Sequence, residues 1–216
     1  MIPCECKEPH ERRRIVLTGG PGAGKTAVLE LVRQYFCRHV DVLPESASIL
    51  FGGGFRRGAT APGKAAAQRA IFHVQLELET VAELEGNAAI TLCDRGTVDG
   101  SAYWPGPGDF WASLGTTRER ELQRYDAVIH LRPPPPGGGY DRSNPVRIES
   151  AAEAALVDQR IEAAWAGHPR VFVVASAADF LAKAHRALEV LRGEMPECCR
   201  HHLVPGETPG RGEAHG

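Results

Sequence analysis

The sequence predicts an α/β protein, a three-layer α/β/α sandwich around a parallel five-stranded sheet. Short apolar runs alternate along the 216 residues with segments of helical periodicity, and the first run ends abruptly in glycines. The chain is 43% hydrophobic and 24% charged, which is typical of a globular protein with a sizeable core. Together these observations favour one α/β domain.

Five short apolar runs are expected to form the strands. They occupy residues 14–18, 40–43, 88–93, 127–131 and 171–174. Helical patterns separate or follow them, at residues 25–39, 64–85, 118–124, 149–166 and 180–191. Because helices cross over between successive strands, the strands are expected to run parallel.

Residues 64–85 are expected to form a long helix with its apolar residues on roughly one face, ended by Gly86 and Asn87. That face is formed by Ala70, Ile71, Val74, Leu78, Val81 and Leu84. Residues 51–63 are rich in glycine and contain two arginines, so we expect a mobile loop there. Residues 132–146 are almost all proline, glycine and polar residues, and they predict a flexible flap.

A phosphate-binding loop, or P-loop, is predicted between the first strand and the first helix. The pattern G-x-x-x-x-G-K-[ST] is satisfied by Gly19, Gly20, Pro21, Gly22, Ala23, Gly24, Lys25 and Thr26. Glycines let successive amides face inward as an anion nest, and the helix that follows directs its positive end there. Lys25 is expected to bind the β- and γ-phosphates, and Thr26 to bind Mg²⁺. A plain connecting turn has no need of Lys-Thr, so this motif predicts binding of ATP or GTP.

The P-loop suggests a division of the chain into three parts. We expect a flexible N-terminal extension at residues 1–13, a nucleotide-binding domain at residues 14–192 and a disordered tail at residues 193–216. With a net charge of −2 and no basic stripe, no nucleic-acid partner is expected. The absence of a signal-like or membrane-spanning apolar segment favours a cytoplasmic location. Nothing in the sequence indicates the oligomeric state.

Two carboxylates are expected at the carboxyl edge of the sheet. Asp94 follows the third strand and is a candidate magnesium ligand, a candidate base toward an acceptor hydroxyl, or both. The alternative is a strand-end aspartate that only caps the next turn. Glu45 follows the second strand and either binds an acceptor hydroxyl, serves as the base, or is a solvated loop carboxylate.

Three arginines bracket the predicted flap. Arg132, Arg142 and Arg147 are candidates to close over a transferring phosphate and exclude water. The alternative is a solvated loop that its arginines keep soluble. Tyr103 and Trp104, just after the Asp94 region, are weaker candidates for an acceptor pocket.

The cysteines give little indication of a metal centre, although the four terminal ones could be assembled into a zinc site with His10, His201 and His202. Cys37 and Cys93 fall in apolar segments and are expected to be reduced core residues. Cysteines at positions 4, 6, 198 and 199 lie in the polar ends, in Cys-x-Cys and Cys-Cys pairs rather than the Cys-x₂-Cys spacing of structural zinc sites. We expect solvated tail residues there.

Residues 14–191 resemble a known family of small P-loop domains. The resemblance depends on the P-loop, on Pro44-Glu45-Ser46-Ala47, on Asp94-Arg95-Gly96 with Asp99-Gly100-Ser101-Ala102-Tyr103, and on residues 144–149. These motifs are similar to those of AAA-like ATP-binding domains, which are grouped with the nicotinamide riboside kinase domain and are close to deoxynucleoside and thymidylate kinases.

The resemblance implies roles for particular residues. In the nucleoside kinases the positions that match Glu45, Asp94, Arg95, Arg142 and Arg147 surround the acceptor. By this resemblance Arg95 steadies the acceptor or the phosphoryl group, and the loop that contains Ser176 holds the base. The lid is richer in proline and glycine than in the kinases, and Gly96 replaces a polar or aromatic residue.

Two functions remain as hypotheses. The first is a kinase that transfers the γ-phosphate of ATP to a small, nucleoside-like acceptor. The second is a regulatory NTP switch that acts through a protein or membrane partner. The sequence has no [NT]-K-x-D motif, and residues 94–97 do not match D-x-x-G, which argues against a conventional GTPase. Only one helix follows the fifth strand, which argues against a hexameric remodelling ATPase.

Overall fold

A computed structural model describes residues 4–135, 151–177 and 179–200. Its five strands form one sheet in the order β2-β3-β1-β4-β5, and every neighbouring pair is parallel. The strands are β1 (Arg13–Thr18), β2 (Val40–Leu43), β3 (Ile90–Asp94), β4 (Ala127–Leu131) and β5 (Val171–Val174). The predicted parallel five-stranded sheet is confirmed, and each predicted strand is present.

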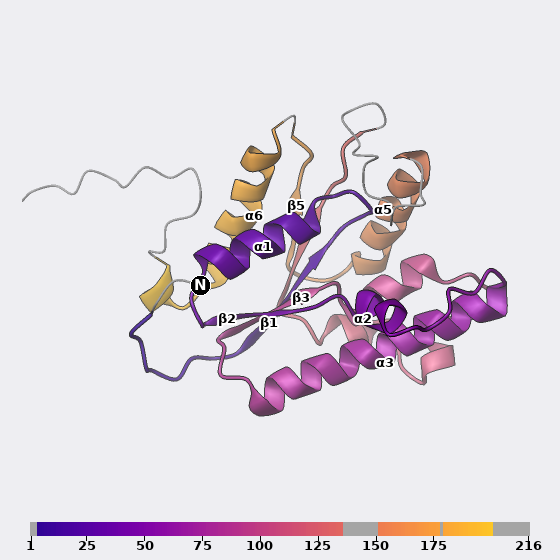
Figure 1. Cartoon of the computed structure of the whole chain (residues 1–216), viewed down its shortest axis with the longest axis horizontal. Coiled ribbons are helices and arrows are strands. Elements are labelled where there is room, and N and C mark those ends of the chain that lie inside the picture. Colours follow the sequence, from indigo (N-terminus) through magenta and orange to yellow (C-terminus); the bar gives the residue numbers. More distant parts are fainter. Residues whose placement is uncertain (1–3, 136–150, 178, 201–216) are drawn as a thin grey trace, which may run out of the picture.

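Helices cover both faces of the sheet (Figure 1). They are α1 (Lys25–Tyr35), α2 (Ser46–Gly52), α3 (Ala61–Glu85), α4 (Arg118–Leu122), α5 (Ala151–Trp165) and α6 (Phe180–Glu194). The described residues also form three short 3₁₀ segments, η1 (Thr97–Tyr103), η2 (Ala112–Leu114) and, after α6, η3 (Glu197–Cys199). The predicted three-layer α/β/α sandwich is confirmed.

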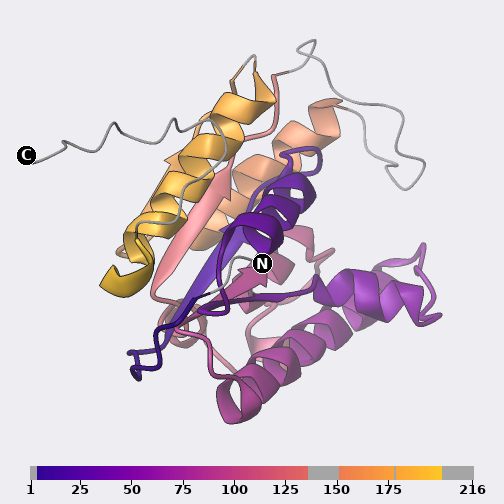
Figure 2. The same cartoon turned by 60° about the vertical axis from the view of Figure 1, so that its left-hand side comes forward.

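Strand residues alternate between two cores. Ile15 and Leu17 face α1 and α6, which lie side by side (Figure 2). Val16 faces the opposite way, toward Ile161 and Trp165 of α5. Because successive side chains of a strand point to opposite faces, one apolar strand supplies both cores. This explains why the strands read as continuous apolar runs.

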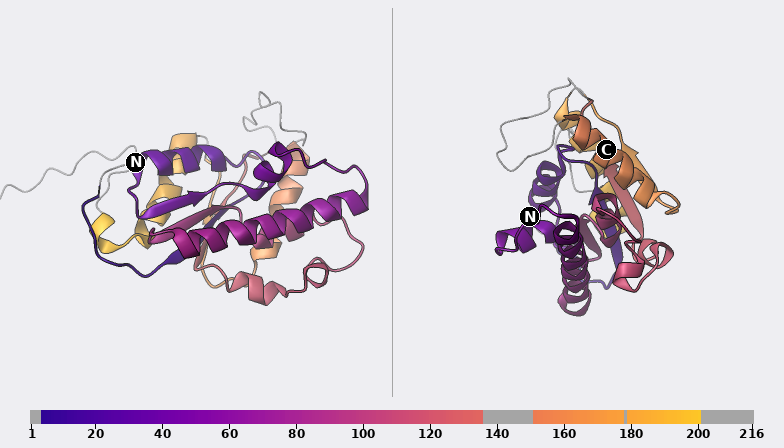
Figure 3. Two further views of the ribbon diagram at one scale, coloured as in Figure 1. Left: turned by 60° about the horizontal axis from the view of Figure 1, so that its bottom comes forward. Right: turned by 90° about the vertical axis from the view of Figure 1, so that its right-hand side faces the viewer.

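Several helix boundaries differ from the predictions, among them those of α1 and α3. The chain leaves α1 after Tyr35, four residues before the expected end, and the next residue, Phe36, has an extended backbone and a buried ring. Helix α3 begins at Ala61, capped by the Thr60 side chain, so the predicted loop at residues 51–63 is shorter than expected. The unpredicted helix α2 packs against α3 (Figure 3).

The domain boundaries remain predictions. Arg13 already belongs to β1, and α6 continues to Glu194, past the expected start of the tail at residue 193. Residues 201–216 and most of the expected flap, including Arg142 and Arg147, lie outside the described residues. Among the described helices, none has the length and apolar character needed to cross a bilayer.

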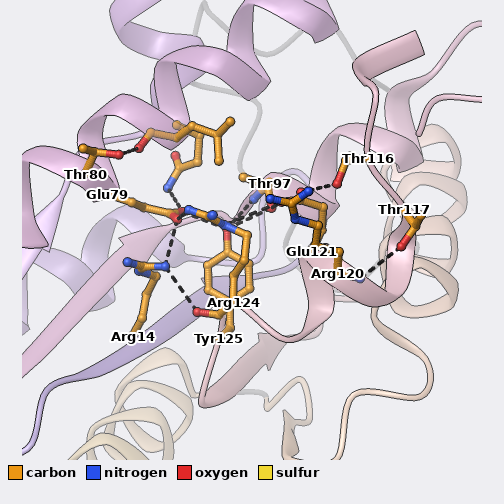
Figure 4. A network of polar contacts seen from close by, with 12 residues as sticks. Arg14, Glu79, Thr80, Thr97, Thr116, Thr117, Arg120, Glu121, Arg124 and Tyr125 are labelled. Carbon is orange, nitrogen blue, oxygen red and sulfur yellow. Dashed lines mark hydrogen bonds and ion pairs between the residues drawn. The ribbon is translucent and has the colours of Figure 1, made fainter. Parts of the chain in front are cut away.

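The apolar face of α3 is buried only in part: Leu78 packs against the core, but the two residues of that face nearest the end of the helix do not. Val81 and Leu84 are 53% and 79% exposed, whereas Phe72, Gln75 and Glu79 are buried. Glu79 contacts Arg14 at 3.3 Å and also binds Arg124, and its carboxylate accepts a 2.7 Å hydrogen bond from Tyr125 (Figure 4). These partners compensate the buried charge, so a polar face packs inward, which the periodicity of apolar residues did not indicate.

Candidate functional site

The backbone of the P-loop adopts conformations that glycine allows and other residues disfavour. Gly19, Gly22 and Gly24 all have positive φ angles, of 137°, 78° and 92°. A Cβ on Gly19 would lie 2.1 Å from the carbonyl oxygen of Leu131, and one on Gly24 would lie 2.6 Å from the ring of Phe180. The loop is therefore pressed against β4 and α6, and only glycine fits at these two positions.

Lys25 folds back on its own loop. Its Nζ donates to the carbonyl oxygens of Gly19 and Gly20, at 2.9 and 3.3 Å. Burial, with the nearby charge of Arg95, lowers the pKa of Lys25 to about 7. The ammonium is thus held at the mouth of the loop, where a bound polyphosphate would restore its charge and replace the carbonyl contacts.

Thr26 and Asp94, the predicted magnesium ligands, both lie at the carboxyl edge of the sheet. Thr26 is the second residue of α1 and is exposed, while Asp94 ends β3 at the same edge of the sheet. Oδ1 of Asp94 is buried without a hydrogen-bond partner, and burial raises the pKa of this carboxyl to about 6 although Lys25 opposes the shift. A hydroxyl and an unsatisfied carboxylate oxygen are the hard donors that Mg²⁺ prefers, so these residues fit the ion.

Arg95 connects the P-loop with the second strand. Its backbone is left-handed, with a φ angle of 72°, which turns the guanidinium toward the loop. Nε donates to Glu45 at 2.9 Å, and Nη1 donates to the Gly19 carbonyl at 3.3 Å and lies 3.5 Å from Asp99. Burial opposes the positive charge, yet Tyr103, Asp99 and Glu45 outweigh it and raise the pKa of Arg95. The guanidinium therefore remains a fixed cation beside the loop.

Glu45 is an ionised carboxylate in this arrangement. Burial alone would raise the pKa of Glu45, but Arg95 and a 2.5 Å hydrogen bond from Ser48 outweigh burial and lower it. Its Oε1 binds Arg95 while Oε2 accepts from Ser48. The structure thus joins Glu45, Arg95 and the P-loop, and the role of this pair toward an acceptor remains a prediction.

A cavity of about 600 Å³ opens beside the P-loop. It begins at Pro21 and is lined by both partners of the Glu45–Arg95 ion pair and by residues of α2, α3 and η1. Its volume falls within the range of small-ligand pockets, about 300–1,000 Å³. Tyr103 lines the cavity and Trp104 does not, so only the first of these two pocket candidates faces it.

Two residues of the site were not predicted from the sequence. Gln75 lines the cavity, and its Oε1 is buried without a partner while its Nε2 donates to Glu79 at 2.9 Å. Asp99 is buried, accepts from the amide of Gly96 at 2.9 Å and also binds the Thr18 hydroxyl. Gln75 lies in the middle of a helix, and no sequence motif around it indicates a role in binding. Asp99 belongs to a motif that carries the family resemblance, but its position in the chain indicates no role for its side chain.

The far side of the P-loop is held by α5 and α6. The amide of Gly20 donates to Asp158 at 2.8 Å, and His130 lies 2.8 Å from the same carboxylate. Nζ of Lys183 donates to the Ala23 carbonyl at 2.7 Å. No sequence pattern indicates these contacts, because Asp158 is 138 residues from Gly20.

Arg132 and Ser176 have different places near this edge. The guanidinium of Arg132 binds Asp158 at 3.0 Å and also Glu162, both on α5. Its described contacts are therefore with helix carboxylates, and its expected role toward phosphate remains a prediction. Ser176 is half-buried in the loop after β5, and its role toward a base likewise remains a prediction.

Comparison with known proteins agrees with the fold. The chain has the fold of P-loop kinases. Two solved structures with this fold are thymidylate kinase from Candida albicans and deoxyadenosine kinase from M. mycoides with bound dATP, both at a TM-score of 0.55. The first is 13% identical over 86% of this chain and 94% of its own, and the second is 14% identical over 83% and 99%.

A family model described as AAA domain matches residues 14–183. The chain belongs to this family, which confirms the resemblance to AAA-like domains drawn from its motifs. A search of curated proteins finds no match to the sequence.

Proposed function

We propose that this protein is a kinase that transfers the γ-phosphate of ATP to a small, nucleoside-like acceptor. The observation that carries the proposal is the cavity that adjoins the P-loop and contains the Glu45–Arg95 pair. A switch that only binds and hydrolyses a triphosphate needs no second pocket of this size next to its phosphate loop. The similarity in fold to two nucleoside and nucleotide kinases agrees with the proposal.

The P-loop and Lys25 would bind the triphosphate. The loop amides and the start of α1 supply donors to the phosphates, and Lys25 moves from the loop carbonyls to the β- and γ-oxygens. Thr26 and Asp94 would hold Mg²⁺, and the ion would neutralise charge on the phosphate oxygens. Positioning and charge account for most of the rate in this class of reaction.

Glu45 is the better candidate for the base. It lines the cavity, whereas Asp94 does not, and a base must lie within hydrogen-bond reach of the proton that it takes. The acceptor oxygen bonds to the γ-phosphorus, the bond to the ADP oxygen breaks, and the acceptor proton passes to the Glu45 carboxylate. Arg95 holds that carboxylate in place and offers its guanidinium to the phosphoryl group.

The side chain of Gln75 favours a phosphate acceptor that carries a hydrogen-bond donor on a ring. Its buried, unsatisfied Oε1 in the cavity wall costs free energy until a donor reaches it. An N–H group of a heterocyclic base would satisfy that oxygen. This argues for a nucleoside-like acceptor rather than a purely apolar one.

Phosphate transfer from labelled ATP to a panel of nucleosides, nucleotides and pyridine nucleosides tests the proposal. We expect transfer to at least one acceptor, and its loss in Lys25→Ala while the exposed Lys7→Ala variant retains it. A protein that releases phosphate to water, responds to no acceptor and distinguishes di- from triphosphate would instead be the regulatory switch. Transfer that survives in Lys25→Ala would refute the mechanism.

Gln75→Leu tests the acceptor pocket separately. We expect the KM for the acceptor to rise about ten- to a hundredfold, because one hydrogen bond to a buried group is lost. The affinity for an ATP analogue should stay unchanged, which also verifies that the variant folds. Gln34→Leu, at an exposed position on α1, is the matched control.

A further inference from the structure

A cluster of cysteine and histidine side chains lies away from the proposed active site. Cys4 comes from the N-terminal segment, Cys37 and His39 from the turn between α1 and β2, and Cys199 from η3 after α6. We call these four residues the inner group. Figure 1 shows the N-terminal segment and the yellow η3 at the end of α1 opposite the P-loop.

The four donor atoms of the inner group contact one another closely. Sγ of Cys199 lies 3.4 Å from Sγ of Cys4 and 3.4 Å from Sγ of Cys37. Nδ1 of His39 lies 3.1 Å from Sγ of Cys199 and 3.3 Å from Sγ of Cys37. All four atoms lie within 4.8 Å of one another.

These separations match the edges of a coordination tetrahedron. Bonds of about 2.3 Å from zinc to sulfur and about 2.0 Å from zinc to nitrogen give edges of roughly 3.5–3.8 Å. The observed contacts of the inner group are a few tenths of an ångström shorter, within the adjustment that side-chain rotation supplies. Three sulfurs and one imidazole nitrogen form a Cys₃His set, which is a common ligand set of structural zinc.

A disulfide explains the cluster less well. The sulfur atoms are 3.4 Å apart, far from the roughly 2.05 Å of a disulfide, and all six cysteines of the chain are free thiols. Cys199 contacts two other sulfurs at once, so any one disulfide would leave a third thiol and the histidine crowded together. A single ion satisfies all four donors.

The burial of the inner group points to a structural role. Cys37, His39 and Cys199 are 0%, 5% and 1% exposed, and Cys4 is half-buried. Such a closed set leaves no open position for a reacting ligand, which distinguishes structural from catalytic zinc sites. The expectation that the terminal cysteines are solvated is therefore wrong for Cys199. The linear spacing gave no indication, because the four ligands come from three distant segments.

We propose that the inner group binds one structural Zn²⁺ ion. The ion would fasten the N-terminal segment and η3 to the turn between α1 and β2. This role explains why two polar ends of the chain converge on one turn of the core. It is independent of the proposed phosphate transfer, because the inner group lies at the amino ends of the strands and the P-loop at their carboxyl ends.

A second set of side chains lies beside the inner group and shares one ligand with it. It consists of Cys6, His10, Cys198 and the shared His39. Nε2 of His10 lies 3.4 Å from the sulfurs of both Cys6 and Cys198. Cys198 is exposed, so this outer group is the less enclosed of the two and serves as an internal comparison.

Metal content of the full chain, purified with zinc and without chelator, tests the proposal. We expect at least one zinc per chain by elemental analysis and native mass spectrometry. Replacement by Co²⁺ should give the visible absorption of tetrahedral cobalt with sulfur-to-metal charge transfer in the ultraviolet. Cys37→Ser should lose the ion, and Cys93→Ser, which alters a buried thiol outside both groups, should keep it.

The outcomes separate the alternatives. If the protein binds one ion, its loss in Cys37→Ser and its retention in Cys198→Ser would support the proposed site in the inner group. If the protein binds two ions, the loss of only the second ion in Cys198→Ser would also support it. A chain without metal whose mass is two hydrogens lower would indicate a disulfide and overturn the proposal. Loss of the sole ion in Cys198→Ser, with retention in Cys37→Ser, would also overturn it. Should Cys37→Ser not fold, the zinc content and the cobalt spectrum of the wild-type protein still decide whether a tetrahedral, sulfur-rich site binds a metal ion.

Discussion

Individual side chains at the P-loop carry charges that depend on their neighbours. Asp94 is half-buried, with its Oδ1 buried and without a hydrogen-bond partner, and Lys25 is held on loop carbonyls. In water both would be fully ionised at neutral pH. Here burial brings the pKa values of both groups near neutrality, so their charge at the site responds to ligands and to pH.

The stability of the nucleotide-free protein should depend on Asp94 between pH 4 and 6. Burial raises the pKa of Asp94 from 3.8 to about 6, so the folded state holds a proton that the unfolded state has lost. The protonated carboxyl therefore adds to the free energy of unfolding. This stabilisation, at most about 3 kcal/mol, is fully present below about pH 4 and is lost as the pH rises through 6. In urea unfolding, the free energy of unfolding of Asp94→Asn should not show this decline with pH. The control variant Asp41→Asn, at an exposed position, should show it. Parallel profiles for wild type and Asp94→Asn would contradict the prediction.

A methyl group at Gly19 should disable the P-loop. Its φ angle of 137° strains any other residue, and a Cβ there would lie 2.1 Å from the Leu131 carbonyl oxygen. We expect Gly19→Ala to abolish binding of an ATP analogue in calorimetry and to lower the free energy of unfolding by more than about 2 kcal/mol. Gly52→Ala is the control, because a Cβ at that position would meet no neighbouring atom within 4 Å. Normal binding by Gly19→Ala would show that the loop relaxes.

At the scale of elements, a buried charge positions helix α3. Glu79 binds two arginines and a tyrosine from β1 and the segment before β4, and this orients the helix that forms one wall of the cavity. Gln75 lies one turn earlier on the same face. The wall of the proposed acceptor pocket thus depends on an ion-pair network rather than on apolar packing alone.

Removing Glu79 should destabilise the protein strongly. Glu79→Ala removes the buried carboxylate that Arg14 and Arg124 share, although Arg124 keeps an ion pair with Glu121. Loss of one partner from such a buried ion pair typically costs about 3–5 kcal/mol. Glu83→Ala removes a carboxylate that is 68% exposed and also pairs with Arg14, and it should cost less than about 1 kcal/mol. Urea unfolding of the two variants measures the difference. Equal small losses would mean that water replaces Glu79 at little cost.

At the scale of the whole molecule, the two proposed sites lie at opposite ends of the sheet. The P-loop follows β1 at the carboxyl edge, and the inner group precedes β2 at the amino edge. No shared side chain joins them among the described residues. Free energies of ligand binding at separate, uncoupled sites add.

Chelation and nucleotide binding should therefore have additive effects on thermal stability. Removal of zinc should lower the midpoint of unfolding, and an ATP analogue at about a hundred times its Kd should add about 2.7 kcal/mol with or without zinc. Thermal unfolding with and without each ligand measures the four states. A nucleotide effect that disappears after chelation would indicate that the zinc site also organises the P-loop.

The sequence by itself determined the strands, their parallel direction and the P-loop, because these depend on local periodicity and on glycines at fixed spacing. It also indicated Glu45, Asp94 and Arg95, since residues that end parallel strands meet at one edge. Only the tertiary structure decided that α3 turns a carboxylate inward, that Gln75 lines the cavity and that the inner group converges. Those contacts join residues far apart in the chain, and their free energies depend on burial and partners that no local pattern contains.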